Sequence, residues 1–549
     1  MPQKSFKAYP QGQGYLFPMN LDDLIPQDSP VRLVNQIVDS LDITKIIDTY
    51  KGGGTSSYHP RMMLKIVLYA YLNNIYSCRK IEQNTRDRIS FMWLSGMQTP
   101  DHNTINLFRS LHLKDTISDI FTQVVLMLVD MGHLTLETAY FDGTKIESKA
   151  NRYTFVWRKS LEKSKAKLEA KIKTILVQID ECIAQDNQPD DEPPTPFNTE
   201  ELKKRIAQIN REKLSKEQKK EVKALENKHL PKLEEYEKKL EVLGERNSYS
   251  KTDHEATFMR LKDDHMQNGQ LKPAQNLQIV TENQFYTHYD MFSNPNDTRT
   301  LIPLFKGYEK RYDKMPEQGV GDSGYGSEEN YDFMEEFNIE PFVKFNYFHK
   351  EQKKSFKNDA FITQNLYYNA EKDYFVCPMG QHLEKVGIGT RTSEGGFVSN
   401  IDYYQAQNCT NCPLKCLCYK AEGNRKIEIN HNLRRHKEKV RKLLTSEEGL
   451  MHRSKRPIEV EPVFGQTKSN KGYNRFRHFG KDKVMMDFGI FAIAFNIGKL
   501  YNKQGIIAIN ALKSLLFDEK SVFFIIFVHM HTFPSTENYF SSQNIKVAA

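Results

Sequence analysis

The first part of the chain carries apolar residues at intervals of three and four, the spacing of one face of an α-helix. The pattern is clear in "VRLVNQIVDSLDI" and again in "RMMLKIVLYAYLNNIY". Turn sequences, "KGGGTSSYHP" and "TPDHNT", separate the helices, and Asp101 or Asn103 is placed to cap the next one. Residues 1–133 are therefore predicted to form a helical domain. Such a module can read DNA through a helix-turn-helix, although small helical bundles more often only pack.

A second helical pattern, over residues 157–250, has the spacing of a coiled-coil seam. A Pro-rich stretch, "DNQPDDEPPTPFNTE", divides it into two runs, and Pro231 is expected to end or kink a helix. The prediction is an antiparallel helical hairpin, inserted as a separate or dimerisation arm. The apolar positions are Leu161, Leu168, Ile172, Ile175, Ile179 and Cys182 in the first run, and Leu202, Ile206, Ile209, Val222, Leu225, Leu233, Leu240 and Leu243 in the second.

Segments with strand-like composition flank this arm. "ETAYFDGTKI" precedes it, while "NLQIVTENQFYTHYDMF" and "EPFVKF" follow it, with the helical "SEENYDFMEEF" between the last two. This alternation predicts an α/β (α+β) fold, in which helices pack on a mixed sheet. Residues 134–156 and 251–350 are therefore assigned to two parts of one catalytic core.

Three carboxylates stand in or beside these elements. Asp142 lies in "AYFDGTK" at the expected end of a strand, and Asp322 lies in "GVGDSGYG" between a strand and a helix. Glu461 lies in "RPIEVEPVFGQTK" on an expected helix. Carboxylates from separate elements can hold two divalent ions that flank a scissile phosphate. Taken singly, an Asp before Gly is more often a turn residue, and a helical Glu near Arg is more often a surface ion pair.

The chain resembles the bacterial insertion-sequence transposases of the DDE class in six ordered stretches. The resemblance implies a ribonuclease H-like core, in which Asp142, Asp322 and Glu461 are catalytic and hold Mg²⁺ or Mn²⁺. It also implies DNA strand cleavage and strand transfer at the ends of the element. The matching stretches are "YHPRMMLKIVLYAYLNNIYSCRKIE", "FMWLSGMQTPDHNTINLFR", "FDGTKIESKANRYTFVW", "DSGYGSEENY", "CPMGQHL" with "CTNCPLKCLC", and "EVEPVFGQTKSNKGYNRFRHFG".

The family branch that the chain resembles has a Tyr-Arg-Glu-Lys type signature around the glutamate, and this chain departs from it. Lys468 matches the signature Lys, seven positions after Glu461 and so on the same face of a helix. The signature Arg would fall at Pro457, whereas Arg456 is one residue further from Glu461, and no Tyr stands upstream. Glu459 therefore stays as an alternative third ligand.

Four of the seven cysteines crowd together, at Cys409, Cys412, Cys416 and Cys418. They form CxxC followed by CxC, and Cys377 and His382 stand upstream in "CPMGQH". CxxC presents two thiolates to zinc on one turn, although CxC is a less usual second half. Residues 351–425 are therefore expected to form a Cys-rich insertion. Its four clustered cysteines either hold a structural Zn²⁺ or pack as reduced thiols.

Positive charge is concentrated in residues 425–483, which contain 17 Lys and Arg against 7 Asp and Glu, although the whole chain has a net charge of +8. Such a segment suits DNA, because Lys and Arg contacts to phosphate release counterions. Residues 426–510 are assigned to a C-terminal catalytic part with basic helices, whose aromatic residues can stack on bases or fill the core. The residues expected to bind DNA are Arg456, Lys468, Lys471, Arg475 and Arg477.

The remaining features limit the class of protein. The N-terminal stretch lacks the apolar core of an export signal, and the apolar run at residues 522–528 is too short to cross a bilayer. We expect a cytoplasmic, nucleoid-associated protein that binds double-stranded DNA, both the terminal repeats and the target, as a homo-oligomer and without a membrane. The alternatives are a catalytically inactive DNA-binding remnant and a structural coiled-coil protein. No role is assigned to the tail, residues 511–549.

Overall fold

The computed structural model describes residues 20–516, except 52–55, 184–198, 210–213 and 262–268. The chain divides into two compact units, one formed by residues 1–108 with 490–549 and the other by residues 109–489. Most of the Pro-rich break of the arm, the apolar run at 522–528 and most of the tail lie outside the described residues.

The first unit is helical, as the apolar spacing predicts. Asp101 caps the last of its N-terminal α-helices, because the Asp101 side chain accepts a hydrogen bond from the backbone N–H of Thr104 at 2.7 Å. The helices are η1 Leu21–Leu24, α1 Pro30–Ser40, α2 Thr44–Ile47, α3 Pro60–Leu72, α4 Cys78–Asp87, α5 Ile89–Ser95 and α6 His102–Leu107.

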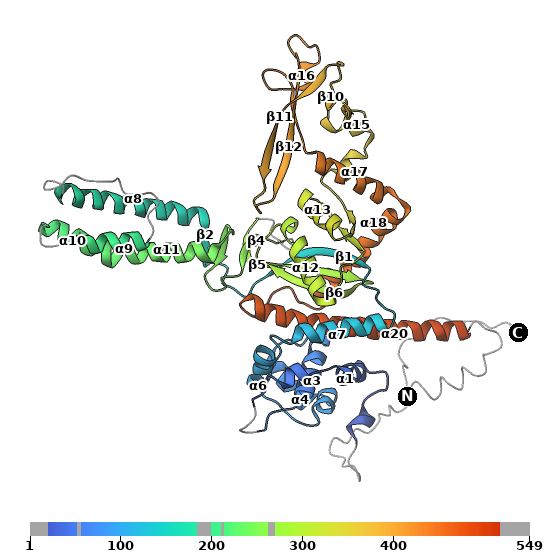
Figure 1. The fold of residues 1–549 in the computed structure, drawn as a ribbon. Coiled ribbons are helices and arrows are strands. Elements are labelled where there is room, and N and C mark those ends of the chain that lie inside the picture. Colours follow the sequence, from blue (N-terminus) through green and yellow to red (C-terminus); the bar gives the residue numbers. More distant parts are fainter. Residues whose placement is uncertain (1–19, 52–55, 184–198, 210–213, 262–268, 517–549) are drawn as a thin grey trace, which may run out of the picture. The chain divides into compact units, whose positions relative to one another are not determined.

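The second unit is built on a mixed six-stranded sheet of order β4-β5-β1-β7-β8, in which β6 also pairs with β5 (Figure 1). The central strand β1 is antiparallel to β5 and parallel to β7, and β7 is parallel to β8. This confirms the predicted mixed sheet. The strands are β1 Thr138–Glu147, β4 Thr257–Arg260, β5 Leu271–Glu282, β6 Phe285–Phe292, β7 Gln318–Gly321 and β8 Glu340–Val343.

Helices of the same unit pack along this sheet. α17 lies against β8, α18 against β7 and α12 against β6. β7 approaches its neighbour closely, since a Cβ on Gly321 would lie 2.5 Å from the ring of Phe141. The helices are α7 Ile117–Asp130, α12 Leu301–Tyr312, α13 Glu328–Glu336, α17 His431–Thr445, α18 Glu447–Glu459 and α19 Glu461–Gly465, with short 3₁₀ turns η5 Asp297–Arg299 and η6 Ser323–Tyr325.

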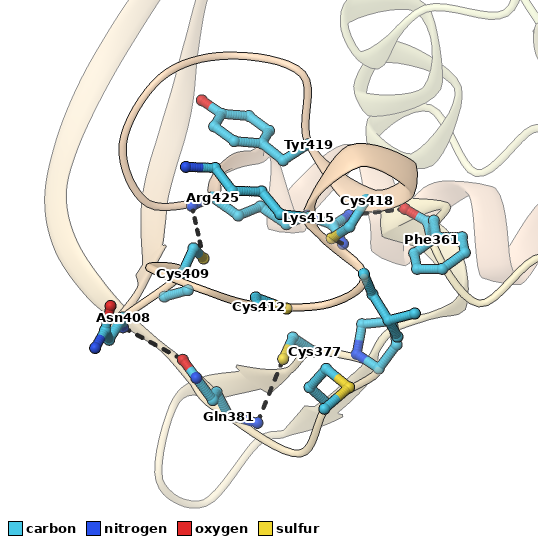
Figure 2. A pocket seen from close by; sticks show the side chains of 14 residues that line it. Phe361, Cys377, Gln381, Asn408, Cys409, Cys412, Lys415, Cys418, Tyr419 and Arg425 are labelled. Atoms are coloured by element: carbon cyan, nitrogen blue, oxygen red, sulfur yellow. Dashed lines mark hydrogen bonds between the residues drawn. The ribbon is translucent and has the colours of Figure 1, made fainter.

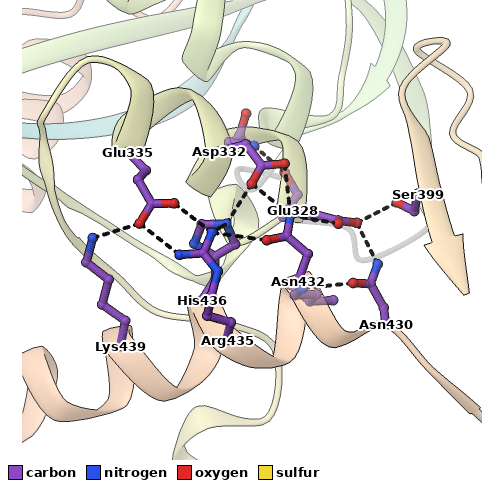
Figure 3. Close-up of polar contacts among 12 residues, drawn as sticks. Glu328, Asp332, Glu335, Ser399, Asn430, Asn432, Arg435, His436 and Lys439 are labelled. Atoms are coloured by element: carbon purple, nitrogen blue, oxygen red, sulfur yellow. Dashed lines mark hydrogen bonds and ion pairs between the residues drawn. The ribbon is translucent and has the colours of Figure 1, made fainter. Parts of the chain in front are cut away.

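A polar network joins α13 to α17 (Figure 3). His436, buried on α17, lies 2.6 Å from an Asp332 carboxylate oxygen, and Arg435 makes a two-pronged contact with Glu335. Glu328 accepts hydrogen bonds from Asn430 and from Ser399. The network therefore ties α17 and the segment around Ser399 to the helix that follows Asp322.

The Cys-rich insertion contains a second, five-stranded antiparallel sheet of order β13-β12-β11-β10-β9, which the sequence patterns did not predict. β11 and β12 form its long hairpin. The elements are β9 Tyr367–Asn369, β10 Tyr374–Val376, β11 His382–Thr392, β12 Val398–Ala406, α16 Lys415–Cys418 and β13 Lys426–Ile429, preceded by α14 Phe348–Glu351, α15 Lys354–Lys357 and η7 Thr363–Asn365.

The predicted helical arm is present, but its described residues form three helical segments and not the two of a hairpin, because α10, η4 and α11 are continuous. α9 lies beside α11, where Thr199 contacts Glu237 and Lys203 pairs with Glu234. A π-helical turn, η4 Leu225–His229, precedes α11, which has Pro231 in its first turn, so Pro231 does mark a helix boundary. The elements are α8 Arg158–Ile183, α9 Thr199–Gln208, α10 Lys216–Ala224 and α11 Leu230–Leu243, with β2 Phe155–Trp157 paired to β3 Ser248–Ser250 at the base.

The arm has its own apolar core, so its removal should leave the second unit folded. Its buried cluster includes Ile172, Ile179 and Leu225, and the seam residues Leu168, Ile175, Leu202, Ile206, Val222 and Leu233 belong to it too. Replacing residues 163–240 by a short Gly-Ser linker keeps Leu161 and Leu243, which pack in a separate cluster at the base. We expect soluble protein with a cooperative thermal transition, checked by circular dichroism. Insoluble protein would show instead that the arm is part of the fold of the unit.

α20, Lys481–Leu516, begins in the second unit and continues in the first. Its segment Lys481–Gln504 is long and apolar enough to cross a membrane, with a mean hydropathy of 1.4 in its most apolar window, but 78% of that window is buried in the protein. Burial of this kind is what the core helix of a folded domain shows.

Candidate active site

The sheet brings two of the predicted carboxylates together. β1 and β7 are parallel, with Ala139 opposite Gly319 and Tyr140 opposite Val320. The same offset carried two residues further sets Asp142 level with Asp322. The strands that carry Asp142 and lead to Asp322 therefore lie side by side in one sheet.

One guanidinium lies between the two carboxylates. Nη2 of Arg456, on α18, is 2.9 Å from Asp142 Oδ2 and 3.9 Å from Asp322 Oδ2. The two oxygens are therefore no more than about 7 Å apart, which is compatible with ions that sit about 4 Å from each other. The Arg456 and Asp142 side chains are 12% and 14% exposed, while Asp322 is 42% exposed. Arg456, expected to bind DNA, thus occupies the space between the two aspartates.

The local settings of the two aspartates differ. Asp322 ends β7 and caps η6, since its Oδ1 accepts from the backbone N–H of Gly324 at 2.8 Å. Asp142 lies within β1, which continues to Glu147, so the prediction of a strand end at Asp142 was wrong. Gly143 serves close packing there and forms no turn, because a Cβ would lie 2.2 Å from the Gln278 side chain.

A third carboxylate, Asp297, lies beside the two and was missed in the sequence. Its Oδ1 accepts hydrogen bonds from the buried side chains of Asn276 at 2.7 Å and Gln278 at 2.9 Å. A Cβ on Gly143 would meet Asp297 Oδ1 at 2.7 Å, and one on Gly324 would meet its Cβ at 3.8 Å. Asp297 starts the 3₁₀ turn that follows β6, and an Asp after a strand and before a helix was the available signal.

Glu461 is exposed at the start of α19. Lys344, which follows β8, relates Glu461 to the site. Burial lowers the pKa of Lys344, and the positive charges of Arg456 and Arg453 lower it further. The negative charges of Asp322 and Glu461 act in the opposite direction. Asp322 and Glu461 therefore both lie within electrostatic range of Lys344. Lys344 was not singled out in the sequence.

The alternative, Glu459, has a different setting. It is buried, and its carboxylate accepts a hydrogen bond from the backbone N–H of Gln284 at 2.7 Å, in the turn between β5 and β6. Its charge also helps to raise the pKa of Tyr140, after burial as the main cause. Glu459 therefore has a packing role at that turn.

The described residues contain no group of three or more His, Cys, Asp or Glu side chains close enough to hold a metal ion. The chemistry of the site nevertheless fits a divalent cation. Two carboxylates already share one positive group, and carboxylate oxygens are the ligands that Mg²⁺ prefers. Arg456 Nε is buried without a hydrogen-bond partner among the described residues, so its guanidinium is only partly satisfied there.

Two of the other residues expected to bind DNA, Lys468 and Arg475, lie close to β1. Lys468 Nζ donates to the backbone oxygen of Lys145 at 3.1 Å, from a π-helical turn, η8 Gln466–Asn470, that interrupts the expected continuous helix from Glu461. Burial lowers the pKa of Lys471. Arg475 donates to backbone oxygens of Ser148, Lys149 and Ala150 but remains about half exposed.

The aromatic residues of this segment mostly fill the core. Tyr473 and Phe476 are buried, and the Tyr473 hydroxyl donates to Asp487 at 2.7 Å. The guanidinium of Arg477 lies 5.1 Å from the centre of the Tyr473 ring. Phe479 is exposed, with Lys149 over its ring. Stacking on bases is thus open to Phe479 but not to the two buried rings.

The structure separates Cys416 from the other cysteines of the insertion. Cys409, Cys412 and Cys418 line one small cavity together with Cys377, which comes from the turn after β10 (Figure 2). Cys416 is exposed and does not line this cavity, and His382 is also exposed. The set of four that lines the cavity therefore differs from the set expected from spacing.

Two segments of the chain match models of transposase families. Residues 19–111 match the family described as "Transposase domain (DUF772)", and residues 376–501 match the one described as "Transposase DDE domain". The second match contains Glu461, whereas Asp142 and Asp322 lie outside both. No curated protein and no solved structure matched the chain. Together with the mixed sheet, the matches show that the chain is an insertion-sequence transposase of the DDE class with a ribonuclease H-like fold.

Proposed function

We propose that the protein binds the ends of its insertion sequence and catalyses DNA strand cleavage and strand transfer, with Asp142, Asp322 and Glu461 as the ligands of divalent ions. One observation carries this proposal. Asp142 and Asp322 lie opposite each other at adjacent parallel strands, and the Arg456 guanidinium lies between them. A structural coiled-coil protein would have no need of that arrangement, and the core of the helical arm is separate from it.

The side chains of the site divide into two groups. Asp142, Asp322 and Glu461 are the acidic group that would hold the ions, Mg²⁺ or Mn²⁺, and ions held there would activate the attacking oxygen and stabilise the leaving oxygen of a phosphodiester. Arg453 and Arg456 are basic residues within electrostatic range of Lys344, and in this proposal the three would hold the scissile phosphate. Arg456 has to leave the two carboxylates before ions can bind between them, because both cations need the same oxygens.

The DNA partners follow from the same proposal. The basic residues beside β1, of which Arg475 is exposed, would grip the phosphates of the terminal repeats, and the target DNA would enter at the same carboxylates. Two ends have to be processed together, so a homo-oligomer on DNA is the expected assembly, in the cytoplasm and on the nucleoid.

Removal of divalent metal should separate cleavage from binding in the wild-type protein. With labelled DNA that carries the element's own ends, EDTA should abolish cleavage, and added Mg²⁺ or Mn²⁺ should restore it. End binding, measured by fluorescence anisotropy, should change by less than about threefold, because its affinity comes from Lys and Arg contacts to phosphate. Cleavage that persists in EDTA would contradict the proposal. Tight binding without cleavage in any metal would instead indicate an inactive DNA-binding remnant.

A further inference from the structure

The Cys-lined cavity of the insertion has the composition of a metal site. Its volume is about 20 Å³, and its walls include the side chains of Cys377, Cys409, Cys412 and Cys418 (Figure 2). Cys377 comes from the turn that links β10 to β11, and the other three come from the segment that links β12 to β13. Two separate loops thus supply four thiols to one small space.

Backbone amides already point at two of these sulfur atoms. The N–H of Gln381 donates to Cys377 Sγ at 3.3 Å, and the N–H of Arg425 donates to Cys409 Sγ at 3.3 Å. The thiolate is the form of cysteine that binds metal, and an N–H group aimed at the sulfur can hydrogen-bond to it there. Outer hydrogen bonds of this kind also fix the orientation of metal ligands.

The neighbouring Arg425 gives an independent indication of negative charge. Its side chain belongs to a residue that is 4% exposed, and it donates through Nη1 to Cys418 Sγ at 3.0 Å and through Nη2 to the backbone oxygen of Phe361 at 2.8 Å. Among the described residues no carboxylate pairs with it. A buried guanidinium is costly without a negative partner. Four thiolates around Zn²⁺ carry a net charge of −2, which would supply that partner.

We propose that Cys377, Cys409, Cys412 and Cys418 form a structural zinc site, with Arg425 as its charge-balancing neighbour and Cys416 outside it. Zinc in structural sites takes four Cys or His ligands in tetrahedral geometry. No three of these side chains already stand at ligand spacing in the described part of the chain, so the ion draws the two loops together as it binds. The site joins two loops at one end of the second sheet and is independent of the catalytic proposal.

The test is the zinc content of the full-length protein, purified without an affinity tag that binds metal. Elemental analysis should find about one zinc per chain in the wild type, and Co²⁺ substitution should give the intense absorption of tetrahedral thiolate ligation. Cys377→Ser, Cys409→Ser, Cys412→Ser and Cys418→Ser should each lose at least about tenfold in zinc affinity. Cys416→Ser, in the same motif but exposed, is the matched control and should keep the wild-type zinc content.

A second measurement uses the wild-type chain and so does not depend on the folding of any variant. Thiol titration should find four slowly reacting cysteines that become reactive when a chelator removes the metal, with a fall in the thermal transition of the protein. Zinc-free protein that takes up neither Zn²⁺ nor Co²⁺ overturns the proposal. Loss of zinc in Cys416→Ser with retention in Cys377→Ser overturns the assigned ligands.

Discussion

Replacing Asp142 or Asp322 by Asn is expected to abolish strand cleavage and strand transfer. Each change keeps the side-chain size but removes one of the two negative charges that converge beside Arg456. Members of a catalytic unit typically contribute rate factors of about 1,000 or more, so excision of a marked element should fall at least that far. Binding to the element's ends should stay within about threefold of the wild type, because phosphate contacts dominate it.

Glu340→Gln is the matched control for these variants. Glu340 is an exposed carboxylate at the start of β8, at the far end of the strand from the site, so its loss should leave excision unchanged. Wild-type excision by both aspartate variants would remove the basis of the catalytic proposal.

A second pair of variants tests which residue is the third ligand of the proposed metal site. Glu461→Gln should abolish excision as the aspartate variants do, whereas Asp297→Asn keeps an oxygen that can accept from Asn276 and Gln278 and should retain most activity. The opposite result would make Asp297 the third acidic ligand. Glu459 is a weaker candidate than either, because its carboxylate is buried against Gln284.

Breaking the buried ion pair between Arg109 and Asp487 is expected to destabilise the second unit strongly. The two side chains are 2% and 1% exposed, and they are directly hydrogen-bonded. Asp487 also accepts from Tyr473 at 2.7 Å, and His478 lies 2.9 Å from the Arg109 guanidinium. Arg109→Met leaves the Asp487 charge buried without this partner, which typically costs about 3–5 kcal/mol. Chemical denaturation, followed by far-UV circular dichroism, measures the loss.

The exposed pair Arg391 and Glu428 provides the comparison, at 68% and 52% exposure. Arg391→Met should cost about 0–1 kcal/mol, the usual range for a surface pair. The double variant Arg109→Met with Asp487→Leu should recover part of the loss, because it leaves neither charge behind. Equal stabilities of Arg109→Met and Arg391→Met would show that the buried pair adds nothing to the fold.

The sequence predicts the strands and the two aspartates because their signals are local. A run such as "AYFDGTK" shows alternation and a following glycine, and "GVGDSGYG" shows a short strand before a helix. The register between β1 and β7 cannot be read from a local pattern, because it pairs residues that are 180 positions apart, such as Thr138 and Gln318. The level placement of the two aspartates required the structure.

The features that the sequence did not show depend on contacts between distant segments. The assignment of Arg456 to DNA stays a prediction, but no local pattern indicated its contacts with carboxylates on other elements. Cys416 was grouped by spacing, although α16 is a single short turn that leaves this side chain exposed while Cys377 approaches from another loop. The second sheet was missed because β11 is largely exposed on both faces and therefore lacks clear alternation.

The contact of Arg456 with Asp142 and Asp322 also implies a thermodynamic linkage. At the proposed metal site, the guanidinium and a metal ion would compete for the same two carboxylates, so each ion that binds would have to displace an arginine that is already in place. A phosphate that draws Arg456 away removes this competitor and strengthens metal binding, and metal binding must strengthen the hold on that phosphate by the same factor. The protein would then be charge-balanced and inert when free, and would load its ions most readily when DNA is already bound.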